Sequence, residues 1–136
     1  MNIIRNFFVL KKNSDTIEFE AIRVKHGDIY SNGYLFNQIG YISDCSSISK
    51  KSLNKLKNLK LLIIDCLKYK SHATHLNFKE CLNYIKILSP KNTILTNLHS
   101  DIDYSSLKKK LLRMSENIIP GQVSFIYLNF YRISNF

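Results

Sequence analysis

Apolar and polar residues alternate across residues 17–24, which is the spacing of a half-buried β-strand. We expect this strand to end at His26, just before a glycine. Two further apolar stretches, 33–36 and 41–44, are separated by turn-forming residues. They predict a hairpin whose second arm ends at Asp44.

A helix over residues 77–88 has the clearest signals in the chain. Asn77 can cap its first turn, and Glu80, three residues later, can complete a capping box. The apolar residues of this segment recur at helical spacing, so they share one stripe, and Pro90 prevents the helix from continuing.

The remaining elements follow from shorter patterns. The continuous apolar run 61–65 is typical of a strand that is covered on both faces. The other expected elements are a short helix capped by Ser47 or Ser49, a strand over 93–98, a helix from Tyr104 and a final strand over 123–133. Because strands alternate with helices over short connections, we expect an α/β fold with one mixed sheet, antiparallel at its start and largely parallel afterwards.

Length and charge limit the function classes. At 136 residues the chain forms one small domain that can bury a core. Its formal net charge of +10 would suit a polyanion such as RNA. However, the abundant residues Lys, Asn, Ile, Tyr and Phe are those that A/T-rich codons specify, and no block of five like charges occurs. An RNA-binding module therefore remains an alternative.

The three cysteines, Cys45, Cys66 and Cys81, are far apart and form no C-x-x-C pair. This pattern argues against a disulfide framework and for reduced thiols. The first residues carry their positive charges after the apolar run, which is the wrong order for a signal peptide. No apolar run reaches the ~20 residues that span a bilayer, so we expect a cytoplasmic protein without membrane contact.

Histidines and a carboxylate recur where predicted strands end. His26, Asp44 and His99 each follow a strand, and His72 and His75 lie in the loop after residues 61–65. In an open α/β sheet the loops at the carboxyl ends of the strands can meet at one edge. Imidazole and carboxylate are ligands for zinc, manganese and iron, so this repeated placement predicts a metal site. The nearby Asp101 and Asp103 are better explained as caps of the helix from residue 104.

Four motifs carry a family resemblance. VKHG, GYLFNQIGYISDCSSI, LLIIDCLKYKSHATHLNFKECL and ILTNLHSDIDY occur in this order over about residues 17–120. In order and spacing they resemble the second half of metallo-β-lactamase-fold hydrolases, in the branch of phosphoribosyl cyclic phosphodiesterase and tRNase Z. The resemblance implies an αββα sandwich of two sheets. Residues 1–136 would form a single partial domain, its C-terminal half, with helices on one face and the other face open, while 121–136 depart from the family pattern.

The resemblance also implies the parts of a two-metal site, which in this family holds divalent cations such as zinc or manganese. His26 and His99 would each bind one metal, and Asp44 would bridge both. His75, or less directly its neighbour His72, would lie beside the substrate phosphate as an acid or as a donor to the oxyanion. Asp65 would support the site without binding metal.

The family's main metal motif, H-x-H-x-D-H, is absent from the sequence. Three ligands shared by two cations leave about two protein bonds for each, fewer than the usual three or four. We therefore expect the C-terminal portion of a metal-dependent hydrolase of phosphodiesterase type that is inactive alone. The alternative is one subunit of a split metallohydrolase, with a partner chain that carries the N-terminal half; without such a partner, the open face would favour self-association.

Overall fold

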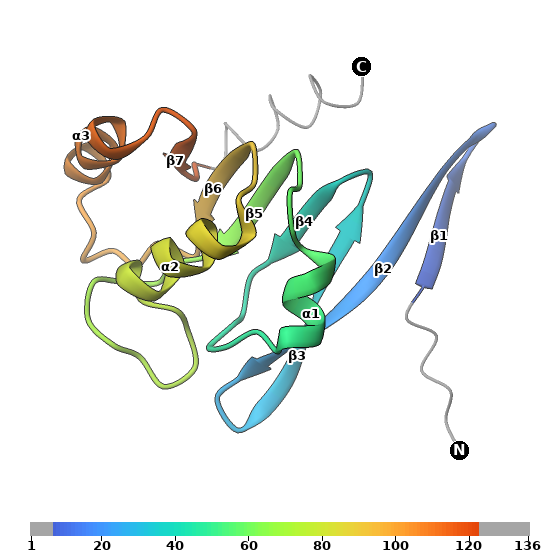
Figure 1. Cartoon of the computed structure of the whole chain (residues 1–136), viewed down its shortest axis with the longest axis horizontal. Helices are drawn as coiled ribbons and strands as arrows, with labels where there is room; N and C mark the ends of the chain where they lie inside the picture. The colour runs from blue at the N-terminus through green and yellow to red at the C-terminus, as the bar shows by residue number, and fades with distance from the viewer. Residues whose placement is uncertain (1–6, 123–136) are drawn as a thin grey trace.

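The computed structural model describes residues 7–122, which form one mixed seven-stranded sheet and three helices (Figure 1). The strands lie side by side in the order in which they occur along the chain. The elements are β1 (Phe7–Lys12), β2 (Asp15–His26), β3 (Ile29–Phe36), β4 (Ile39–Ile42), α1 (Lys50–Lys55), β5 (Leu61–Asp65), α2 (Phe78–Leu88), β6 (Asn92–Thr96), α3 (Tyr104–Met114) and β7 (Ile118–Pro120).

Strand directions confirm the predicted division of the sheet. Strands β1 to β4 pair antiparallel through tight turns. Strands β4 to β7 pair parallel, and the crossovers from β4 to β5, from β5 to β6 and from β6 to β7 contain α1, α2 and α3 respectively. Parallel neighbours need such crossovers, which is why alternating strands and helices were informative in the sequence.

The helix termini lie where the capping residues in the sequence predicted them. The Asn77 side chain accepts from the backbone N–H of Glu80 at 2.9 Å, and the Glu80 carboxylate accepts from that of Asn77 at 2.9 Å. Ser49, one of two candidates, caps α1, and Asp103 caps α3. No helix within residues 7–122 is long and apolar enough to cross a membrane.

Other boundaries differ from the prediction. The sequence patterns missed β1 and β7, and β3 starts at Ile29, four residues before the predicted stretch. The hairpin turn occupies only Asn37 and Gln38, both with positive φ, so β4 begins at Ile39 rather than residue 41. β7 was missed because three residues carry too little periodicity. β1 was missed because the periodicity of only four apolar residues, 7–10, does not distinguish a strand from a helix. The strand expected over 123–133 lies outside the described residues.

All three helices pack on one face of the sheet, as predicted. The largest apolar cluster joins alternate residues of the strands to the apolar stripes of the helices, and Figure 1 shows α1 and α2 lying over the same side of the sheet. Many members of this cluster are at most 2% exposed. Among them, the strands contribute Ile22, Val24, Ile42, Leu62, Ile64 and Leu95, and the helices and the C-cap of α1 contribute Leu88, Leu107, Leu111 and Leu56. Burial of each such side chain stabilises the fold by about 1.5–3 kcal/mol.

The second face of the sheet is less open than we expected. At its centre Ile39, Leu61, Ile63 and Ile94 are at most 5% exposed and form a second cluster. Exposure increases toward the β1–β2 hairpin, where Phe8 is 41% and Leu10 57% exposed. The predicted open apolar face is thus confined to the hairpin end of the sheet.

Candidate metal centre

Four strands end at the same edge of the sheet. β4, β5 and β6 are parallel to one another, and β2 runs in the same direction because it is antiparallel to β3, which is antiparallel to β4. The carboxyl ends of these strands therefore bring together His26, Asp44, Asp65 and Asn97, together with the loops that follow them.

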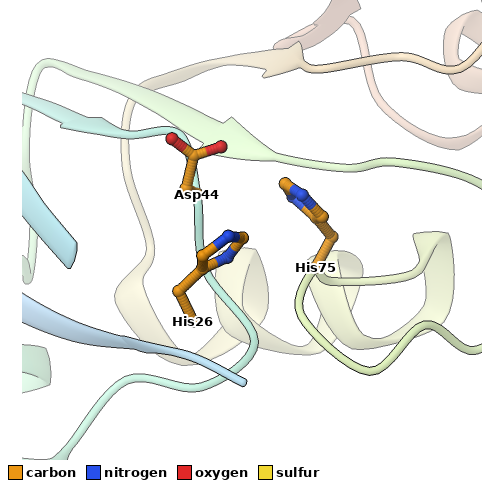
Figure 2. Close-up of side chains that lie close together, drawn as sticks. All are labelled: His26, Asp44 and His75. Atoms are coloured by element: carbon orange, nitrogen blue, oxygen red, sulfur yellow. The ribbon is translucent and has the colours of Figure 1, made fainter. Parts of the chain in front are cut away.

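Three metal-ligating side chains gather at this edge. One possible ligand atom from each of His26, Asp44 and His75 lies within 4.8 Å of the others. Figure 2 shows the two imidazoles and the carboxylate turned toward a common space, from the end of β2, the loop after β4 and the loop before α2. The two imidazole centroids are 4.8 Å apart, with ring planes at 78°.

His26 is held by the loop that carries His75. Its Nδ1 donates to the backbone carbonyl of Thr74 at 2.8 Å, since a carbonyl can only accept. The chain turns away at Gly27, with φ of 63°, where a Cβ atom would lie only 2.8 Å from the Thr74 methyl carbon. Glycine at this position therefore allows the β2 turn and the His75 loop to approach closely.

His75 is oriented by Asp65, which is fully buried at the end of β5. Oδ2 of Asp65 accepts from the backbone N–H groups of Cys45 and Leu76, both at 3.2 Å. The same oxygen lies 2.9 Å from Nδ1 of His75, so Nδ1 carries the hydrogen and donates. One carboxylate thereby links the loop after Asp44 to the loop around His75.

The electrostatics of Asp65 reflect two opposing effects. Burial raises the pKa of its carboxyl above the usual value, while the His75 imidazole and the backbone donors lower it. Because burial is the larger effect, the carboxylate depends on its donors to remain ionised. The role that the resemblance implied for Asp65, supporting the site without being a ligand, agrees with these contacts.

Asn97 is a site residue that the sequence reasoning did not assign. Its Nδ2 donates to Oδ1 of Asp65 at 3.1 Å and to the carbonyl of Ser43 at 3.2 Å, and lies 3.4 Å from Oδ1 of Asp44. Its φ of 59° turns the chain at the end of β6. Asparagine tolerates this conformation better than most residues, which was the available signal.

Asp44 is the exposed and loosely held member of the cluster. Within residues 7–122 its carboxylate has two contacts, both long: 3.4 Å from Asn97 Nδ2 and 3.5 Å from the Ser43 hydroxyl. The chemistry of the three donors fits a divalent cation: two imidazoles and one carboxylate match the ligand types of zinc sites. The freedom of Asp44 allows it to adjust its distance to the histidines.

The other sequence-predicted residues lie apart from this cluster. His99 is not part of it; its imidazole is 43% exposed, and its Nδ1 lies 3.2 Å from the Asp101 carboxylate. His72 is exposed, with its ring centroid 5.4 Å from that of His75. Asp103 caps α3, as its sequence position suggested, and accepts from the backbone N–H of Ser106 at 2.7 Å. The ligand role expected for His99 thus stays a prediction that this geometry does not favour.

Comparison with known proteins identifies a family. Residues 4–97 match the family described as beta-lactamase superfamily domain. A curated relative, an octanoyltransferase from Porphyromonas gingivalis (strain ATCC BAA-308 / W83), is 26% identical over 80 residues, which are 58% of this chain and 16% of the relative.

Solved structures share the fold. A diphosphatase from the PhnP family matches with a TM-score of 0.75 and 25% identity over 84% of this chain and 43% of its own. The short form of human tRNase Z matches with a TM-score of 0.60 and 15% identity, covering 86% and 44%. The metallo-β-lactamase fold protein YhfI from Bacillus subtilis matches with a TM-score of 0.63 and 17% identity, covering 83% and 48%. The chain thus spans less than half the length of each of these proteins.

Proposed function

Because the chain belongs to the beta-lactamase superfamily and has the fold of its metallo-β-lactamase hydrolases, we propose that it contributes part of a metal-dependent active site for phosphodiester hydrolysis. The observation that carries the proposal is the convergence of His26, Asp44 and His75 at one edge of the sheet. The similar diphosphatase favours a phosphate-containing substrate, with hydrolysis at phosphorus.

Each residue has a distinct task in this proposal. His26 and Asp44 would hold the metal, and a bound divalent cation would supply an activated water and stabilise charge on the phosphate oxygens. His75 contacts the phosphate or the leaving oxygen, to which Nε2 donates a hydrogen bond when both ring nitrogens carry hydrogen. Asp65 keeps the hydrogen on Nδ1 of His75 and fixes the plane of its ring, so that Nε2 faces the substrate.

A second set of ligands is required for this chemistry. Two-metal hydrolysis uses both cations to stabilise the attacking and leaving oxygens, and the described residues offer a single cluster of three donors. We therefore propose that the chain is inactive as a phosphodiesterase until a half-domain with the H-x-H-x-D-H motif joins it, within the same protein or from a separate chain.

The test is a fusion of the N-terminal half of the PhnP-family diphosphatase to residues 1–136 through a flexible linker. A folded, metal-loaded fusion should hydrolyse bis(p-nitrophenyl) phosphate, and His26→Ala should abolish the turnover. His75→Ala should lower the turnover without releasing the metal from the completed site. Glu116→Ala, at an exposed position outside the cluster, is the matched control.

Two outcomes would contradict the proposal. Metal-dependent turnover by pure residues 1–136, lost on His26→Ala, would show that no second half is needed. A fusion that folds and binds metal but hydrolyses no phosphodiester would show that the substrate class is wrong.

A further inference from the structure

We propose that this chain by itself binds one divalent cation, through Nε2 of His26, Nε2 of His75 and a carboxylate oxygen of Asp44. The inference deepens the proposed function, on whose metal dependence it rests. It differs from what the family resemblance implies, which is two cations, His99 as a ligand and His75 beside the substrate. In the chain alone, His75 is the third ligand.

The number and type of donors support a single open site. Catalytic zinc commonly has three protein ligands and one exchangeable position, and two histidines with one carboxylate form one of the recurring sets. His26, Asp44 and His75 supply this set within 4.8 Å, so all three serve one cation instead of being divided between two.

Both imidazoles already have the hydrogen placement that metal binding requires. Nδ1 of His26 donates to the Thr74 carbonyl at 2.8 Å, and Nδ1 of His75 donates to the Asp65 carboxylate at 2.9 Å. A neutral imidazole with hydrogen on Nδ1 has its free electron pair on Nε2. Metal-binding histidines almost always donate their second N–H to a carboxylate or a backbone carbonyl, and this chain has one of each.

Contraction of the cluster is possible without moving the sheet. Metal bonds of about 2.0–2.2 Å hold neighbouring ligand atoms roughly 3.3–3.6 Å apart in a tetrahedral site. In this structure, one possible ligand atom from each of the three residues lies within 4.8 Å of the others. Asp44 can move closer to the imidazoles by side-chain rotation, because it is exposed and its contacts with Ser43 and Asn97 are 3.5 and 3.4 Å long.

His99 is held outside the set by its own loop. Its backbone N–H donates to the carbonyl of Leu67 at 2.8 Å, and its Nδ1 accepts from the backbone N–H of Asp101 at 3.2 Å. The position at the end of β6 that reaches the site belongs to Asn97, whose amide contacts Asp44 and Asp65. An amide group that donates to two carboxylates positions them and does not compete for the cation.

The donor set selects among metals. Imidazole nitrogen suits zinc, cobalt and nickel, whereas magnesium and calcium prefer oxygen ligands. With two nitrogens and one carboxylate, the site should bind Zn²⁺ and Co²⁺ and show no measurable binding of Mg²⁺ at comparable concentration.

The experiment measures metal binding by the chain of residues 1–136, without any activity assay. Calorimetric titration with Zn²⁺ should give one cation per chain, and Co²⁺ should give visible absorption bands of a low-coordinate nitrogen–oxygen site. Asp44→Asn, at an exposed position where the fold tolerates change, and His75→Ala should each weaken binding by at least about 100-fold. Even the outer partners of ligating histidines affect metal affinity by about 10- to 100-fold.

His99→Ala and His72→Ala are the matched controls, since both remove an exposed imidazole near the site. Both variants should keep the wild-type affinity and the Co²⁺ spectrum, and circular dichroism should show that every variant is folded. Loss of binding in His99→Ala, unchanged binding in Asp44→Asn, a stoichiometry of two, or no binding at all would overturn the inference.

The experiments can reject either proposal independently of the other. Binding of one cation by the isolated chain without phosphodiester hydrolysis by the fusion would leave this inference standing and reject the proposed function. Hydrolysis by the fusion without binding by the isolated chain would reject this inference alone.

Discussion

At the scale of single residues, Asp65 determines the arrangement of the site. A fully buried carboxylate is costly unless its oxygens are hydrogen-bonded, and Asp65 accepts from Cys45, His75, Leu76 and Asn97. These four donors come from three loops at the carboxyl ends of strands. The residue that stabilises the edge of the sheet is therefore also the one that sets the tautomer of His75.

Buried thiols give the fold a defined response to alkaline pH. A hydrogen bond with Cys66, together with burial, raises the pKa of the Cys81 thiol well above its ordinary range. In the unfolded chain this thiol ionises at about pH 8.5, while in the folded chain it keeps its proton. Above that pH the unfolded state binds fewer protons, so the free energy of unfolding falls as the pH rises, by at most about 1.4 kcal/mol per pH unit for one thiol.

Urea unfolding of the wild type and Cys81→Ala from pH 7 to 10, under reducing conditions, checks this expectation. The variant should be less stable at pH 7, because it leaves a cavity, but its stability should fall less steeply above pH 9. Equal slopes for the two proteins would show that Cys81 does not contribute to the alkaline loss of stability.

At the scale of elements, the N-terminal cap of α2 stabilises the segment next to the metal-site loop. Its cap residue Asn77 lies two residues after His75 and is part of a reciprocal capping box with Glu80. A cap that satisfies backbone N–H groups stabilises the first turn, so its loss frays the segment that follows the metal-site loop. Stability and metal affinity should therefore respond to the same substitution.

Asn77→Ala should lower the free energy of unfolding by about 1 kcal/mol, measured by urea denaturation. It should also weaken Zn²⁺ binding by the isolated chain. Asn83→Ala, at an exposed position inside the same helix, is the control and should be neutral or slightly stabilising, because alanine has the higher helix propensity. A cap variant as stable as the control would show that the capping box contributes nothing.

At the scale of the whole molecule, the two faces of the sheet differ. One is covered by helices, and the other carries an aromatic row in which Phe8, Phe19 and Phe36 follow one another across β1, β2 and β3. Phe8 and Phe19 are stacked at 4.9 Å, and the row continues toward the buried cluster around Ile63. Exposed apolar side chains on the end strand of a sheet favour association with another chain.

We predict that the chain self-associates through the β1–β2 hairpin when no partner covers it. The net charge of +10 opposes association at low salt, but charge repulsion is screened beyond about 8 Å at physiological ionic strength. Sedimentation at increasing NaCl should therefore show larger species, and Leu10→Lys should suppress them. Met114→Lys, an equally exposed apolar position on α3, is the control and should behave as wild type. A monomer at all salt concentrations would show that the hairpin is not an association surface.

The sequence by itself determined the parts of the fold that depend on local chemistry. Residues 61–64 are apolar throughout because β5 is covered on both faces. Helix α2 begins at its capping box and ends before Pro90. The order of strands and helices was also sufficient to predict a mixed sheet, because parallel neighbours require crossovers. Because loops at the carboxyl ends of strands that run in the same direction meet at one edge, His26 and Asp44 could be assigned to one edge from sequence alone.

Only the tertiary structure decided which of the residues near that edge meet. His99 and Asn97 both follow β6 within three residues, and the left-handed turn at Asn97 brings the asparagine to the carboxylates while His99 turns to Asp101. His75 joins the cluster because Asp65, ten positions earlier in the chain, holds its ring. Such choices depend on hydrogen bonds between distant segments and on single backbone angles, which leave no periodic pattern in a sequence.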